Sequence, residues 1–166
     1  MSKRFSNLNN KVLNWDDALR LRNIWALKGE SVAFTNGCFD LLHYGHLHYL
    51  AQARDLGDRL VIGLNSADSV RRLKGSRRPI HDEATRFFQM ASLFFVDLVV
   101  GFEEDTPLAL IQTLQPDILV KGGDYQIQDI IGADFVRNRG GQVIILPFVQ
   151  GYSTTSIEQK ILQHPQ

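Results

Sequence analysis

The chain has 166 residues, of which 44% are hydrophobic and 22% charged, and its 18 basic residues balance 18 acidic ones. This length suffices for one domain with a hydrophobic core, and the balanced charge gives no overall attraction to nucleic acid or to an anionic membrane. The single cysteine, Cys38, excludes an intrachain disulfide. Because neither a signal-peptide core nor a bilayer-spanning apolar stretch is visible, we expect a cytoplasmic protein with no nucleic-acid and no membrane partner.

Residues 1–30 are predicted to form an N-terminal extension with one helix. Asn14 followed by Asp17 resembles a helix N-cap, and Gly29 indicates the end of a helix over residues 15–28. This helix precedes the first predicted strand, so we expect it to pack on the outside of the main domain, which comprises residues 31–166.

The main domain alternates short apolar runs with longer amphipathic segments. The runs lack polar alternation, which is typical of strands buried on both faces of a parallel sheet. They cover residues 31–35, 59–64, 97–101, 117–121 and 142–147. Helices are predicted over 46–56, from a cap at Asp82 to about 94, from a cap at Thr106 with Pro107 in the first turn, over 129–139, and over 153–162. This alternation predicts a Rossmann-like α/β fold with an open parallel sheet.

Ligands of open α/β sheets bind at the carboxyl ends of the strands. The loops after the first, second and fourth predicted strands therefore matter most for function. They cover residues 36–46, 65–78 and 122–125.

The first of these loops carries His43-Tyr44-Gly45-His46 at a strand-to-helix turn. Gly37 and Gly45 allow a phosphate to approach the backbone, and the helix N-terminus offers free N–H groups. Walker A and GxGxxG patterns are absent, so a nucleotide must be held another way. Two alternatives are ordinary polar residues in a first helical turn and, with His48, a metal site. His48 is two residues from His46 and faces away on a helix, which disfavours metal.

A basic segment follows the second strand, with five cations between residues 71 and 78. Such a run is commonly a solvated face. Its position at the ligand side of the sheet favours a loop that closes over a triphosphate, with Lys74 as the candidate ligand.

Two later segments also lie at the ligand side. Lys121-Gly122-Gly123-Asp124-Tyr125 combines backbone freedom with a polar and a stacking side chain, although composition alone favours a plain turn. Gly151-Tyr152-Ser153-Thr154-Thr155-Ser156 begins the last helix. Its hydroxyls and free N–H groups suit a phosphate, whereas an ordinary N-cap needs only one hydroxyl.

Together these elements resemble the cytidylyltransferase-like nucleotidyltransferase superfamily, with its HxGH motif at residues 43–46 and its STT segment at 153–155. The segments FTNGCFDLLHYGH, LNSADSVRRLKG, EEDTP, VKGGDY and GYSTT are similar to the adenylyltransferases of ADP-heptose synthesis. The resemblance covers residues 31–162 and identifies 31–166 as the nucleotidyltransferase domain. Such enzymes occur alone or as the C-terminal half of a bifunctional kinase–adenylyltransferase.

The resemblance implies transfer of AMP from ATP to D-glycero-β-D-manno-heptose 1-phosphate, giving ADP-heptose and pyrophosphate for lipopolysaccharide core synthesis. Mg²⁺ is expected to arrive with ATP, without identified protein ligands. A separate heptose kinase is expected upstream, and relatives commonly form homodimers. The alternatives are a cytidylyltransferase acting on glycerol 3-phosphate or another phosphorylated alcohol, and a nucleotide-binding or scaffolding protein that has lost its chemistry.

The resemblance also implies residue roles. His43, His46 and Lys74 are the expected catalytic residues. Asp40 and Arg86 are expected near the sugar phosphate or the triphosphate; Asp40 alternatively positions the motif loop or helps to hold Mg²⁺, and Arg86 is alternatively a helix-surface cation. Nucleotide-binding residues are expected to be Asn36, Gly37, Cys38, Phe39, Gly45, His46, Lys121, Gly122, Gly123, Asp124, Ser153, Thr154 and Thr155.

Overall fold

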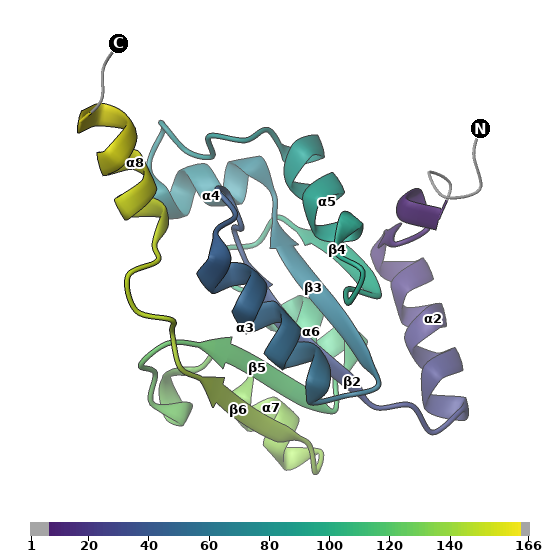
Figure 1. Cartoon of the computed structure of the whole chain (residues 1–166). Coiled ribbons are helices and arrows are strands. Elements are labelled where there is room, and N and C mark those ends of the chain that lie inside the picture. Colours follow the sequence, from purple (N-terminus) through teal and green to yellow (C-terminus); the bar gives the residue numbers. More distant parts are fainter. Residues whose placement is uncertain (1–6, 164–166) are drawn as a thin grey trace.

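The computed structural model of the chain describes residues 7–163. Its centre is a six-stranded parallel sheet with the order β1-β4-β3-β2-β5-β6 (Figure 1). The strands are β1 (Val12–Leu13), β2 (Val32–Gly37), β3 (Arg59–Asn65), β4 (Leu98–Phe102), β5 (Ile118–Gly122) and β6 (Gln142–Leu146). The predicted Rossmann-like α/β fold is thereby confirmed, and the five predicted strands all exist.

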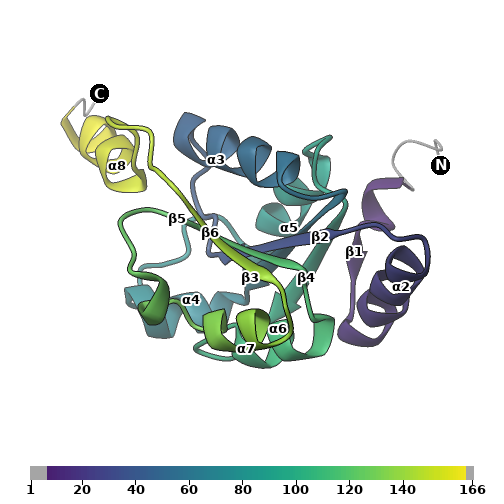
Figure 2. The ribbon, with the colours of Figure 1, turned by 90° about the horizontal axis from the view of Figure 1, so that it is seen from below.

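Helices cover both faces of the sheet. They are α2 (Trp15–Leu27), α3 (Tyr44–Asp55), α4 (Ala67–Lys74), α5 (Glu83–Ser92), α6 (Leu108–Leu114), α7 (Ala133–Asn138) and α8 (Thr154–Gln163), with a 3-10 helix at Ile127–Asp129. Figure 2 shows α3 and α5 on one side of the sheet and α6 and α7 on the other. Alternate strand residues enter the two cores, as Phe34 joins one and its neighbour Ala33 the other. This two-sided burial explains the unbroken apolar runs in the sequence.

The N-terminal helix is confirmed, and its cap is the predicted one. The side chain of Asn14 accepts a hydrogen bond from the Asp17 amide at 2.9 Å. Trp15 Nε1 donates to the carbonyl of Gly101 at 2.7 Å, and Ala18 is buried in one of the cores. The structure adds β1, which pairs with β4 and which a two-residue strand could not signal through periodicity.

Three predicted elements differ from the observed ones. Residues 67–74, predicted as part of a loop, form α4, whose N-cap Ser66 accepts from the Ser69 amide at 3.1 Å. Thr106 does not cap α6, because the N-cap is Pro107 and makes no side-chain hydrogen bond. The helix predicted over 129–139 is split into the 3-10 helix and α7, since Gly132 between them has a φ of 89°.

The strand order reverses between β2 and β5. The chain proceeds from β2 through β3 to β4 on one side and continues with β5 and β6 on the other. The crevice outside the carboxyl ends of β2 and β5 is where sheets of this class bind ligands. Within residues 7–163, no helix has the length and apolar character needed to cross a bilayer.

Candidate active site

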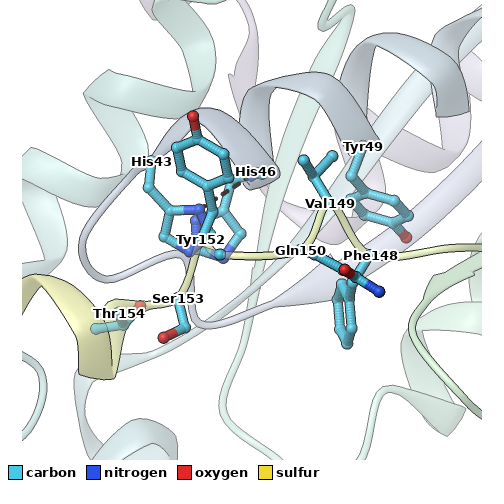
Figure 3. A pocket seen from close by; sticks show the side chains of 11 residues that line it. His43, His46, Tyr49, Phe148, Val149, Gln150, Tyr152, Ser153 and Thr154 are labelled. Atoms are coloured by element: carbon cyan, nitrogen blue, oxygen red, sulfur yellow. Dashed lines mark hydrogen bonds between the residues drawn. The ribbon is translucent and has the colours of Figure 1, made fainter.

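The two histidines of the HxGH motif stack against each other at the start of α3 (Figure 3). Their ring centroids are 3.8 Å apart with 22° between the planes. His43 is the N-cap, and its Nδ1 accepts from the His46 amide at 3.3 Å. An accepting Nδ1 leaves the ring proton of His43 on Nε2, where it is available to a ligand. Helix α3 begins two residues before the predicted start because a histidine serves as its cap.

Gly45 leaves little room for a side chain in this packing. A Cβ atom at position 45 would lie 3.1 Å from Nδ1 of His43 and 3.3 Å from Cβ of Tyr152. Either contact is closer than carbon atoms normally approach, so a side chain would displace the His43 ring or the segment before α8.

Both imidazoles are neutral near pH 7. Burial, reinforced by the nearby Lys74 ammonium and by repulsion between the two stacked imidazoles when both would be protonated, lowers the pKa of His46 from 6.5 to about 4. Burial likewise lowers the pKa of His43. A neutral imidazole carries one N–H, so each ring offers one hydrogen bond to an anion.

These pKa shifts predict a pH-dependent stability of the ligand-free protein. The unfolded state binds a proton at His46 below pH 6.5, whereas the folded state resists protonation until about pH 4. The free energy of unfolding should therefore fall as the pH drops from about 6.5 towards 4. Urea unfolding at about pH 7 and about pH 5 measures this fall. Equal falls in the wild type and in His46→Ala would refute the assignment to His46.

The five cations of the basic segment differ in their surroundings. Arg71 pairs with Asp68, Arg72 with Asp105 at 2.7 Å, and Arg78 with both Asp40, at 2.9 Å, and Glu158. Lys74 and Arg77 make no ion pair or hydrogen bond within residues 7–163. These two exposed cations are therefore the ones available to an anionic ligand.

Asp40 is buried and links the motif loop to the residues that follow the basic segment. Its carboxylate accepts from the amides of Ile80 and His81, at 2.8 to 2.9 Å, and from Arg78. Burial by itself would raise the pKa of Asp40, but these donors outweigh it and the pKa is lowered. Because both oxygens already accept hydrogen bonds, the geometry favours loop positioning over Mg²⁺ coordination.

Arg86 is fully buried, so the alternative that it is a helix-surface cation is wrong. Its Nη1 donates to the carbonyls of Cys38, at 2.9 Å, and Asn65, at 2.8 Å. These two residues follow β2 and end β3, and Arg86 therefore fastens together two loops at the carboxyl edge of the sheet. It lies outside the linings of the cavities described below.

The ends of β2 and β5 meet through Asn36 and Lys121. Lys121 Nζ donates to Asn36 Oδ1 at 2.5 Å, and burial lowers the pKa of Lys121 to about 8. Cys38 lies nearby with its Sγ 3.9 Å from Asn65 Oδ1, and burial raises the pKa of its thiol. Cys38 is therefore poorly suited to act as a thiolate.

The glycines after β5 lie under an aromatic ring. Gly123 has a φ of 119°, and a Cβ at this position would lie 2.5 Å from the Phe148 ring. A Cβ at Gly122, the last residue of β5, would lie 3.1 Å from the Tyr49 ring and 3.2 Å from the Phe148 ring, whereas Asp124 is exposed. At the start of α8, the Ser153 hydroxyl accepts from the Ser156 amide at 3.0 Å and so caps the helix.

Three cavities adjoin these residues. The aromatic cavity, of about 400 Å³, lies between the start of α3 and the segment before α8 and is lined by His43, Tyr49, Phe148, Tyr152 and Thr154 (Figure 3). The central cavity, of about 270 Å³, brings together Asn36, Gly37, Cys38, Phe39, Asp40, His46, Lys74, Lys121, Gly122 and Thr154. The outer cavity, of about 660 Å³, is lined by Lys74, Arg77, Arg78, Thr155, Glu158 and Gln159 among others.

The structure thus gathers most of the expected site residues around one crevice. Sequence reasoning missed the aromatic residues Tyr49 and Phe148 and the free cation Arg77. An aromatic residue just beyond the carboxyl end of β6 was the available signal for Phe148. Tyr49 gave no such signal, because an aromatic residue inside a helix ordinarily indicates core packing.

Fold and site together define a doubly wound α/β protein whose switch-point crevice is lined by His46, Lys74 and Lys121. A family model described as cytidylyltransferase-like matches residues 34–160, and the chain belongs to this family. The chain is also 54% identical over 151 residues to the bifunctional protein HldE of Magnetococcus marinus, and 58% identical over 136 residues to that of Trichlorobacter lovleyi. These alignments cover 91% and 82% of this chain but only 31% and 28% of the relatives, so the chain spans about a third of their length.

Two solved structures are similar as well. The lipopolysaccharide core biosynthesis protein of Thermoplasma volcanium is 30% identical with a TM-score of 0.59, and the match covers 75% of this chain and all of that one. Pantoate-beta-alanine ligase of Francisella tularensis has the same TM-score at 15% identity, over 93% of this chain and 79% of its own. The second likeness concerns the fold alone.

Proposed function

We propose that the protein transfers the adenylyl group of ATP to D-glycero-β-D-manno-heptose 1-phosphate, releasing pyrophosphate and forming ADP-heptose for lipopolysaccharide core synthesis. The observation that carries this proposal is the central cavity, where His46, Lys74 and Lys121 face one space of about 270 Å³. A neutral N–H donor and two amines around one small cavity suit a transferring phosphoryl group. The similarity to the HldE proteins and to the lipopolysaccharide core biosynthesis protein supports the choice of substrate.

In the proposed reaction, an oxygen of the sugar phosphate attacks the α-phosphorus of ATP in line. A new P–O bond forms while the bond from the α-phosphorus to the bridging oxygen breaks, and pyrophosphate leaves with that oxygen. The nucleophile is already an anion and needs no general base. The protein must align two polyanions and neutralise the charge that develops, for which His43, His46 and Lys74 are the candidates.

We propose that Mg²⁺ enters with the triphosphate of ATP. Among residues 7–163, no group of three or more histidine, cysteine, aspartate or glutamate side chains is arranged to hold a metal ion. The two oxygens of Asp40 are engaged by Arg78 and by the amides of Ile80 and His81. Mg²⁺ prefers oxygen ligands and keeps several waters, so we propose that phosphate oxygens of ATP and water supply most of its ligands.

The proposal predicts that pyrophosphate appears from ATP only when the sugar 1-phosphate is present. A coupled pyrophosphate assay with ATP, CTP, GTP and UTP, each with and without heptose 1-phosphate, tests it. CTP with glycerol 3-phosphate is the informative competitor. If that pair turned over far faster, the substrate assignment would be wrong while nucleotidyl transfer stood. ATP binding without turnover on any sugar phosphate would instead favour a protein that has lost its chemistry.

Three further proposals concern the setting of this reaction. A kinase must act upstream, because the acceptor is itself a phosphate ester, and we place both steps in the cytoplasm, where ATP is available.

We also propose a homodimer. Phe94, which is 92% exposed, is the most exposed aromatic residue in the described part of the chain and a natural candidate for its contact surface. Sedimentation of the wild type and of Phe94→Ser tests this proposal.

A further inference from the structure

The outer cavity differs in chemistry from the aromatic cavity. The aromatic cavity is bordered by the rings of Tyr49, Phe148 and Tyr152, which suit the flat base of a nucleoside. Among residues 7–163, no aromatic side chain lines the outer cavity. Its wall combines four aliphatic side chains with the hydroxyl of Thr155, the side-chain amide of Gln159 and cations. Hydroxyl and amide groups suit a ligand with many hydroxyls, such as a sugar.

The outer cavity carries a net positive charge that is not neutralised by ion pairs within residues 7–163. Glu158 is the one carboxylate that the described residues place in its lining, and this group is paired with Arg78. Lys74 and Arg77 line the same cavity and have no anionic partner within residues 7–163. An acceptor phosphate placed between them would gain charge-assisted hydrogen bonds without breaking any existing ion pair.

Lys74 connects the outer cavity with the place of reaction. It lines both the outer cavity and the central cavity, where it lies with His46 and Lys121. A phosphate held by Lys74 and Arg77 would therefore lie at the boundary of the two cavities, with its sugar in the outer one. The volume of about 660 Å³ is the largest of the three and leaves room for a seven-carbon sugar.

We propose that the outer cavity binds the acceptor, a sugar phosphate, with the Arg77 guanidinium on its phosphate and the Gln159 amide on a sugar hydroxyl. The proposal rests on the function proposed above and deepens it by assigning the two substrates to different cavities. It also gives α8 two tasks, since Thr154 lines the aromatic cavity and Thr155 and Gln159 line the outer one.

The test separates the Michaelis constants of the two substrates. Arg77→Gln should raise KM for heptose 1-phosphate at least about tenfold and leave KM for ATP nearly unchanged, because a charge-assisted hydrogen bond to one substrate is lost. Arg77→Lys should recover part of the loss. Arg71→Gln is the matched control: it removes the same charge from the same segment, but Arg71 pairs with Asp68 and lines none of the three cavities. A rise in KM for ATP, or no change in either constant, would overturn the proposal.

Binding measured without turnover distinguishes this proposal from the proposed function. Calorimetric titration of heptose 1-phosphate into protein saturated with a non-hydrolysable ATP analogue should show binding to the wild type and at least about tenfold weaker binding to Arg77→Gln. Wild-type turnover together with unchanged binding in the variant sinks the cavity assignment alone. Binding to the wild type without turnover would contradict the proposed reaction. The cavity assignment would then be decided by whether Arg77→Gln binds heptose 1-phosphate more weakly than the wild type does. Absence of both binding and turnover in the wild type sinks both.

Discussion

His46→Ala should lower kcat by about 10²–10³-fold while the protein remains folded, because one preorganised donor to the transferring phosphoryl group is lost. His46 suits this role because it lines the central cavity and because its ring is held against His43 with centroids 3.8 Å apart. The low pKa, of about 4, keeps the ring neutral and its single N–H available at pH 7. Single-turnover kinetics with saturating ATP and heptose 1-phosphate measure the effect on the chemical step, and circular dichroism checks the fold.

His48→Ala is the matched control for this experiment. His48 is the next imidazole on α3 and lies outside the linings of the aromatic, central and outer cavities. Its removal should leave kcat within about threefold of the wild-type value, since its side chain lines none of the cavities in which the substrates are proposed to bind. Comparable losses in both variants would show that His46 acts through the packing of α3 and not through a contact with substrate.

Arg86→Met should lower the free energy of unfolding by about 1–3 kcal/mol, the cost of leaving buried carbonyls without a donor. Methionine retains most of the apolar length of the side chain but removes both hydrogen bonds from Nη1, leaving the carbonyls of Cys38 and Asn65 without this donor. Because Cys38 belongs to the loop between β2 and α3, the placement of the HxGH motif should loosen as well. Urea unfolding measures the stability, and the pyrophosphate assay measures the accompanying loss of activity.

Arg20→Met provides the comparison for Arg86. The Arg20 side chain is 78% exposed and, within residues 7–163, pairs with Asp17 alone, so its loss should cost less than about 1 kcal/mol. If Arg86→Met unfolded at the same urea concentration as the wild type and kept its activity, the proposed fastening of the two loops would be wrong.

Five of the six strands, β2 to β6, were predictable because their sequences carry a clear signal. Both faces of the sheet are buried, so strands such as β3, with six of its seven residues buried, are continuously apolar. Helix caps were predictable where a short polar side chain precedes the helix, as with Asn14 and Asp82. The start of α3 was misplaced because a histidine cap is outside this common set.

Helix α4 shows where composition misled the sequence analysis. Its eight residues include three cations, and the segment was therefore interpreted as a loop. Ser66 caps the helix, Val70 is buried on its inner face, and Gly75 ends it with a φ of 94°. An amphipathic helix of two turns offers too short a window for periodicity to outweigh such a charged composition.

The amino-acid sequence by itself determined the class of fold, the edge of the sheet that carries the site and the motif residues His43 and His46. These features follow from local patterns, namely apolar runs, spacing and strand-to-helix order. The tertiary structure alone decided which cations are free. Arg78 is engaged by Asp40 and Glu158, which lie 38 residues before it and 80 residues after it, whereas its neighbour Arg77 has no partner within residues 7–163. Such long-range pairing depends on how the chain folds back on itself. It distinguishes Arg77 from Arg78, two adjacent arginines that the sequence alone gives no reason to treat differently.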